Sequence, residues 1–142
     1  MKMKNLKKEV FALCLIMLSL SIMTVHAQVD KKLAKAETNF CNSINTFAQS
    51  LVTLDAINEN STMDEFKKAY KSADKAWNKL EKKAAKLEKV EMKESVKAYN
   101  KLVDAVNSIE GDVKTSEAAE QINQHIDATA AEISDILSVV CK

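Results

Sequence analysis

The three cysteines are the residues of this chain whose chemistry is easiest to interpret. Cys14 lies in an apolar stretch near the start, whereas Cys41 and Cys141 lie far apart in the rest of the chain. Two sulfur atoms and one distant histidine are too few ligands for a structural zinc site. An even pair of cysteines in an exported protein is typical of a disulfide. We therefore expect a Cys41–Cys141 disulfide that closes a loop of about 100 residues.

Export is predicted from the start of the chain, which has the three parts of a secretory signal peptide. The basic stretch Lys2–Lys8 precedes the apolar run Val10–Val25, and small residues then stand at the −3 and −1 positions before Gln28. The apolar run is about 16 residues long, short of the ~20 that a membrane-spanning helix needs. We expect cleavage between Ala27 and Gln28.

Cleavage would divide the chain into a signal peptide, residues 1–27, and a single domain, residues 28–142. That domain is long enough to bury a core of its own. It would be exported to the periplasm or the exterior, and we expect no transmembrane segment in the mature chain.

Every basic side chain outside histidine is a lysine, because the sequence contains no arginine. The planar guanidinium of arginine is favoured wherever phosphate or nucleic-acid bases are recognised through paired hydrogen bonds. We therefore expect no nucleic-acid partner.

His125 is the only histidine after the predicted cleavage position, and it flanks an apolar stripe. No second histidine, cysteine or acid has metal-ligand spacing with it, and no nucleophile stands beside a base. Small exported four-helix cytochromes have an outline that this chain resembles in architecture alone, because a Cys-x-x-Cys-His haem motif is absent. We expect no cofactor, no metal site and no enzymatic activity.

The chain has one glycine, Gly111, and no proline, so it lacks most of the residues that break helices. Apolar residues recur in steps of three and four, which predicts helices with one buried seam, similar to a coiled coil. These stripes are Leu33, Ala36, Phe40, Ile44, Phe47, Leu51 and Leu54; Met63, Phe66, Tyr70, Ala73, Trp77, Leu80, Ala84 and Leu87; Met92, Val96, Tyr99, Val103 and Val106; and Ala119, Ile122, Ile126, Thr129, Ile133, Ile136 and Val140.

Helix boundaries are marked in two places. Thr62 followed by Glu65 is a capping box, which predicts that a helix begins there. Gly111 breaks a later boundary, after which Thr115 or Ser116 is expected to cap the last helix.

Residues 88–94 leave the topology open. The step from Leu87 to Met92 rotates the apolar face by about 140°. A turn between two antiparallel helices would explain this rotation, and so would one continuous helix whose second half packs on a different side. No glycine, proline or asparagine marks a turn there. A row of lysines also continues through it, and it would stay on one face of an unbroken helix: Lys68, Lys71, Lys75, Lys79, Lys82, Lys86, Lys89, Lys93 and Lys97.

The cysteines discriminate between the two arrangements. With helix ends level, a four-helix up-down bundle places Cys41 and Cys141 about 25 Å apart at ~1.5 Å per residue. A disulfide requires Cα atoms within about 7 Å. One long helix over 63–110 brings both cysteines to nearly the same level. We therefore expect an all-α antiparallel bundle of three long helices, with a four-helix up-down bundle as the alternative.

Charge is divided along the chain. Residues 67–101 contain twelve lysines and five acids, whereas residues 102–141 contain one lysine and eight acids. One interpretation is internal complementarity between the acidic last helix and the basic middle. The other is a lysine stripe that binds an anionic envelope polymer or a protein partner.

From these features we expect an exported, non-enzymatic helical protein that serves as an interaction or structural module of the bacterial envelope or exterior. The alternative is a carrier of a small apolar ligand in a groove between helices.

Overall fold

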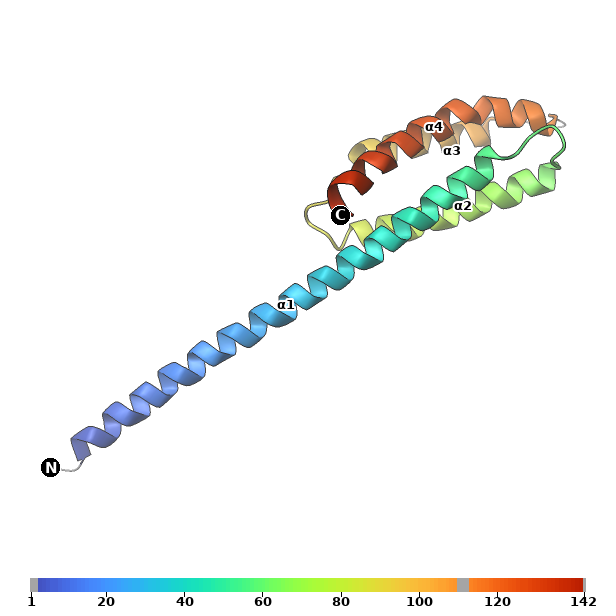
Figure 1. Ribbon diagram of the computed structural model, residues 1–142. Helices are drawn as coiled ribbons and strands as arrows, with labels where there is room; N and C mark the ends of the chain where they lie inside the picture. Colours follow the sequence, from blue (N-terminus) through green and yellow to red (C-terminus); the bar gives the residue numbers. More distant parts are fainter. Residues whose placement is uncertain (1–2, 110–112, 142) are drawn as a thin grey trace. The chain divides into compact units, whose positions relative to one another are not determined.

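A computed structural model describes the backbone of residues 3–109 and 113–141, and the side chains of residues 28–109 and 113–141. The described part contains four helices and no strand (Figure 1): α1 (Met3–Asp55), α2 (Met63–Ala84), α3 (Lys93–Asn107) and α4 (Thr115–Val140). The predicted all-α fold is confirmed.

Contacts within the chain define two units, residues 1–35 and 36–142. The side chains of residues 28–35 are exposed, and the described core belongs to the second unit. The side chains of the predicted signal peptide, residues 1–27, lie outside the described residues, so cleavage between Ala27 and Gln28 stays a prediction. In the described part of the chain, no helix is long and apolar enough to cross a membrane.

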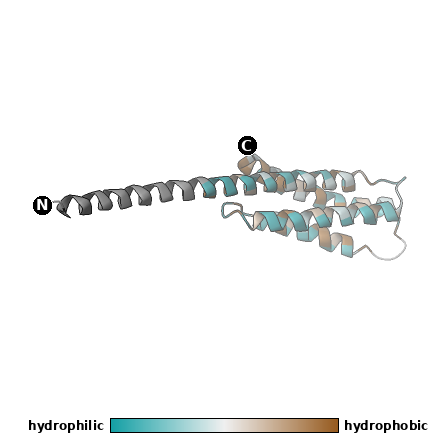
Figure 2. Cartoon of the chain, turned by 90° about the horizontal axis from the view of Figure 1, so that it is seen from below, coloured by the Kyte–Doolittle hydropathy of each residue, from teal (hydrophilic) through white to brown (hydrophobic). Residues whose placement is uncertain are grey.

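The core of the second unit is formed by the apolar seams predicted for α1, α2 and α4. Figure 2 shows hydrophilic and hydrophobic residues alternating along the helices, as expected where each helix has one buried face. Leu33 is an exception with 43% of its surface exposed, because it precedes the unit that contains the core. The buried seam residues include Phe40, Ile44, Phe47, Leu51 and Leu54 of α1, Phe66, Ala73, Trp77, Leu80 and Ala84 of α2, and Ala119, Ile122, Ile126, Thr129 and Ile133 of α4.

The predicted single helix over 63–110 is wrong, and the four-helix alternative is correct, because the chain turns between α2 and α3. The turn begins with tightened hydrogen bonds that span three residues rather than four. The amides of Lys86 and Leu87 donate to the carbonyls of Lys83 and Ala84 at 3.2 and 2.9 Å, and the amide of Val90 donates to Leu87 at 3.3 Å.

Apolar side chains stabilise this turn in place of glycine or proline. Leu87 is buried, and Val90 and Met92 pack against the core. Burial of three apolar side chains contributes several kcal/mol, at about 1.5–3 kcal/mol for each one fully buried. That contribution exceeds the helix propensity of the intervening lysines and glutamates, which amounts to tenths of a kcal/mol per residue.

α3 buries a face that overlaps only in part with the one predicted, and Tyr99 is common to both. Its buried residues are Ser95, Ala98, Tyr99 and Leu102, whereas Val96, Val103 and Val106 of the predicted stripe are only half-buried. The prediction followed the larger apolar side chains. The structure instead buries the small Ser95 and Ala98 together with Tyr99 and Leu102.

A stagger between helices explains how a four-helix bundle accommodates the disulfide. Figures 1 and 2 show that α1 ends short of the end of the bundle where α2 begins, and that residues 56–62 cover the remaining length. The separation of about 25 Å between the cysteines held only for helix ends that are level. Because α1 is displaced in this way, Cys41 and Cys141 form the predicted disulfide, with their Cα atoms 5.7 Å apart.

The predicted cap of α2 is confirmed, and that of α4 is wrong. The Glu65 amide donates to the Thr62 hydroxyl at 3.2 Å, and the Thr62 amide donates to the Glu65 carboxylate at 2.7 Å. In α4 the cap position belongs to Lys114, because its carbonyl accepts the first helical bond, from the amide of Ala118 at 3.0 Å. Thr115 is therefore the first residue inside the helix.

Candidate functional site: the lysine face of α2 and its groove

The structure divides the predicted row of nine lysines among three segments. Lys68, Lys71, Lys75, Lys79 and Lys82 lie on α2; Lys86 and Lys89 lie in the turn; and Lys93 and Lys97 lie on α3. All nine are exposed. The row would have been continuous only along an unbroken helix, so the turn leaves the five lysines of α2 as the part that shares one helix face.

These five residues, Lys68, Lys71, Lys75, Lys79 and Lys82, form what we call the lysine face of α2. Their spacing places them within about 80° of one another around the helix axis. The buried residues Ala73, Trp77 and Leu80 lie on the other side of the helix. The lysine face is therefore directed towards solvent.

No ion pair among the described residues neutralises the lysine face. Among the described residues, the only lysine with a carboxylate oxygen within 4.0 Å is Lys97, which pairs with Glu94 on α3 at 2.8 Å. Both partners are about 60% exposed, so that pair contributes little to stability. The described lysines of the basic middle segment thus form no direct ion pairs with the acids of α4.

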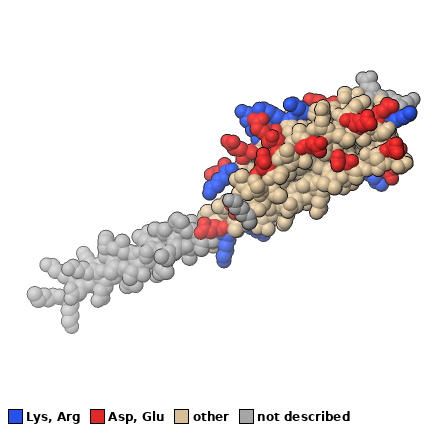
Figure 3. Space-filling model, turned by 45° about the horizontal axis from the view of Figure 1, so that its top comes forward, with Lys and Arg blue, Asp and Glu red and all other residues tan. Residues whose placement is uncertain are grey.

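The acidic side chains form a surface of their own. α4 carries five acids and no lysine. Figure 3 turns the top of Figure 1, where α4 lies, towards the viewer, and many acidic side chains are visible on this face, with lysines mainly towards its edges. The charge division of the sequence therefore corresponds to different surfaces of the bundle.

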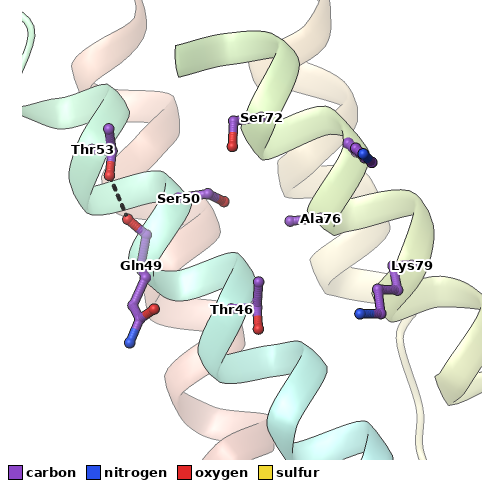
Figure 4. A pocket seen from close by; sticks show the side chains of 8 residues that line it. Thr46, Gln49, Ser50, Thr53, Ser72, Ala76 and Lys79 are labelled. Carbon is purple, nitrogen blue, oxygen red and sulfur yellow. Dashed lines mark hydrogen bonds between the residues drawn. The ribbon is translucent and has the colours of Figure 1, made fainter. Parts of the chain in front are cut away.

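A groove of about 380 Å³ runs between α1 and α2 beside the lysine face. One wall comes from α1 and the other from α2, as Figure 4 shows from close by. Ser50 and Ala76 are buried at its floor, and the other lining residues are exposed, so the groove is open to solvent. Its lining consists of Thr46, Gln49, Ser50, Thr53, Ser72, Lys75, Ala76 and Lys79.

Hydroxyl groups dominate the α1 wall of this groove. Thr46, Ser50 and Thr53 follow one another in steps of four and three, which places them on one face of α1. Each hydroxyl donates its proton to a carbonyl of its own helix, at 2.8, 2.6 and 3.0 Å respectively. Towards the groove, these oxygens can therefore only accept hydrogen bonds.

Sequence reasoning missed the hydroxyl wall. The three-and-four spacing of Thr46, Ser50 and Thr53 beside the apolar seam was the available signal. It could not show that this row would face α2, because the rotation of α1 about its axis is set by packing.

The aromatic seam residues form part of the core. Phe47, Trp77 and Tyr99 come from three different helices, with ring centroids 5.1 Å apart for Phe47–Trp77 and 4.4 Å apart for the stacked Trp77–Tyr99 pair. Tyr99 donates from its hydroxyl to Asp74 Oδ1 at 3.1 Å. Burial, and then the negative charge of Asp74, raises the pKa of Tyr99 well above its usual value, so this hydroxyl stays protonated.

His125 lies half-buried in a second groove, of about 450 Å³, between α3 and α4. The groove is also lined by Lys101 and Asp104 of α3, by Ser108 just after α3, and by Gln121 of α4. The Nε2 atom of the His125 ring lies 3.4 Å from Gln124 Nε2. In the described part of the chain, no group of three or more His, Cys, Asp or Glu residues could hold a metal ion.

A third groove, of about 290 Å³, is the most apolar of these. Glu81 and Ala85 line it with Ala84, Leu87, Val90 and Met92, at the turn between α2 and α3. Its volume is just below the ~300–1,000 Å³ of known small-molecule sites. Carriage of an apolar ligand stays a prediction.

Comparison of the chain with protein-family models, with curated proteins and with solved structures gives no match.

Proposed function

We propose that this protein is an exported, non-enzymatic helical module that binds an anionic polymer of the bacterial envelope. The observation that carries the proposal is the lysine face of α2, in which five exposed ammonium groups share one side of a helix and have no carboxylate within 4.0 Å among the described residues.

Binding by such a surface would be electrostatic. Exposed lysine side chains act as mobile point charges, which attract a polyanion without selecting one fixed geometry. Salt screens such charges over about 10 Å at 0.1 M ionic strength, so binding should weaken steeply as salt is added. The acidic α4 surface would repel the same polymer and thereby orient the protein on it.

Co-sedimentation with bacterial envelope fragments tests the proposal. The protein should sediment with the fragments at low salt and be released at high salt. Fragments extracted with acid to remove their phosphate-bearing polymers should retain much less of it. Equal retention by intact and extracted fragments, or none at either salt, would count against an anionic polymer as partner.

Charge variants locate the binding surface. Lys68→Gln, Lys71→Gln and Lys82→Gln together remove three charges from the lysine face without touching the core. Lys93→Gln, Lys97→Gln and Lys101→Gln on α3 are the matched control with the same net charge. The α2 variant should lose more affinity than the α3 variant. Equal losses would mean that total charge, rather than the α2 surface, determines binding.

A further inference from the structure

The geometry points to the groove between α1 and α2 as a specific site for an anionic saccharide. This inference depends on the proposed polyanion binding and adds the chemical class of the ligand. In it, the acidic group of the saccharide lies beside Lys75 and Lys79, and its hydroxyl groups bond to the wall formed by Thr46, Ser50 and Thr53.

The cationic side of the groove comes from two residues one helical turn apart. Lys75 and Lys79 are the only members of the lysine face that also line the groove. Figure 4 shows the side chain of Lys79 bent towards α1, over the groove. Because neither ammonium group has a carboxylate within 4.0 Å in the described part of the chain, both can bind the anionic group of a ligand.

The opposite wall selects for hydrogen-bond donors. The protons of Thr46, Ser50 and Thr53 are already donated to backbone carbonyls, so their oxygens present lone pairs to the groove. The amide of Gln49 adds both a donor and an acceptor beside them. A phosphate polymer without hydroxyl groups has no donor for this wall, whereas a sugar has several.

Together the two walls match a ligand that is anionic and also hydroxylated. The groove volume of about 380 Å³ is within the range of known small-ligand sites, ~300–1,000 Å³. The exposed ends of the groove would let a longer chain continue along the lysine face. These features distinguish an anionic saccharide from a simple polyanion and from a neutral glycan.

Affinity for three soluble probes tests this inference with the oxidised exported protein: phosphorylated dextran, polyphosphate of matched charge, and neutral dextran. The wild type should bind phosphorylated dextran more tightly than polyphosphate and should not retain neutral dextran.

The variant Thr46→Val with Thr53→Val removes two hydroxyls and keeps the side-chain shape. It should lose about tenfold in affinity for phosphorylated dextran, the size expected for one to two hydrogen bonds. Its affinity for polyphosphate should be unchanged.

Two further variants separate loss of the hydroxyls from loss of the fold. Thr46→Ser with Thr53→Ser keeps both hydroxyls and should retain wild-type affinity, and Ser134→Ala with Ser138→Ala on exposed positions of α4 should also bind normally. If both phosphate probes bind equally and the valine variant binds like the wild type, the saccharide site is overturned while polyanion binding stands. If no anionic probe binds, both proposals fail.

Discussion

Asp74 and Tyr99 show how one polar contact can join two helices of a largely apolar core. Tyr99 is 2% exposed and comes from α3, whereas Asp74 is half-buried on α2. The hydroxyl of Tyr99 donates to Asp74 Oδ1, and the amide of Asn78 donates to Asp74 Oδ2 at 3.2 Å. The ring of Tyr99 also stacks on Trp77. These contacts link α3 directly to α2.

Tyr99→Phe should lower the free energy of unfolding by about 1 kcal/mol, the usual net contribution of one hydrogen bond. The ring contacts would be preserved, so the loss reports the hydroxyl alone. Urea denaturation followed by tryptophan fluorescence measures it. The matched control is Tyr70→Phe, because the half-buried Tyr70 makes no hydroxyl hydrogen bond to the described residues. Equal unfolding midpoints for the two variants would contradict a stabilising Tyr99–Asp74 bond.

Stability should decrease above about pH 10, and Tyr99 should cause part of the decrease. In the unfolded chain its hydroxyl loses the proton near the ordinary value of 10.0, whereas burial and the carboxylate of Asp74 raise the pKa of Tyr99 in the folded chain. Above the unfolded pKa, the folded state therefore binds more protons, and the free energy of unfolding falls with rising pH. Burial followed by Asp74 raises the pKa of Tyr70 as well, with an effect in the same direction.

Urea denaturation across this alkaline range measures the effect. Tyr99→Phe should show a shallower fall in stability than the wild type. Lysine titration is common to both proteins, so the difference between them isolates Tyr99. Parallel curves for the two proteins would show that this hydroxyl does not couple titration to folding.

Thr62→Ala should destabilise the start of α2 by about 1 kcal/mol, as expected for loss of an N-cap side chain. The hydroxyl accepts from the amide of Glu65, and the returning bond holds the Glu65 carboxylate against the Thr62 amide. That amide, and then the hydroxyl, lowers the pKa of Glu65. The capping contribution of Glu65 is therefore lost as pH falls through its folded pKa. Thr62→Ser retains the cap and should stay close to the wild type in thermal denaturation.

At the scale of secondary structure, Leu87 is the most buried of the three apolar residues that stabilise the turn between α2 and α3. Leu87 is 6% exposed. Backbone N–H groups in and near this turn form the hydrogen bonds that span three residues where the chain reverses. Leu87→Ala should lower the free energy of unfolding by about 2–3 kcal/mol, because it leaves a cavity at the end of the core. Lys86→Ala, on the exposed side of the same turn, should change it by less than about 0.5 kcal/mol. Similar values for the two variants would show that Leu87 does not stabilise the turn.

At the scale of the whole molecule, the disulfide connects the beginning of the described core to its end. Cys41 on α1 and Cys141 after α4 are 100 residues apart, and both pack against the core. A cross-link over this length restricts the unfolded chain, which the loop-entropy model values at up to ~4.7 kcal/mol.

Replacing both cysteines, Cys41→Ser with Cys141→Ser, should lower the free energy of unfolding by about 2–5 kcal/mol. Helical content at low temperature should remain, because the apolar seams are unchanged. Urea denaturation of the oxidised protein, the reduced protein and the double variant makes the comparison. If reduction leaves stability unchanged, or intact mass shows two free thiols in the exported protein, the structural role of this disulfide is contradicted.

Much of this architecture is encoded locally. The absence of proline, the single glycine and the three-and-four spacing of apolar residues were sufficient for the all-α fold and for the buried faces of α1, α2 and α4. The capping box at Thr62 and Glu65 was equally local, since both residues lie within one turn of helix. The cysteine pair followed from the number of sulfur atoms left after the predicted signal peptide.

Tertiary packing decided the features that depend on more than one segment. The turn at 85–92 contains no residue that requires one, and it forms because Leu87, Val90 and Met92 gain more from covering the core than from a longer helix. The inward face of α3 includes the small Ser95 and Ala98, while the larger Val96 and Val103 are only half-buried, so side-chain size alone did not set it. The groove between α1 and α2 likewise exists only because packing brings Thr46 and Thr53 of α1 and the lysines of α2 into one lining. A sequence determines which face of a helix is apolar, but the partner against which that face packs is fixed by the free energy of the assembled core.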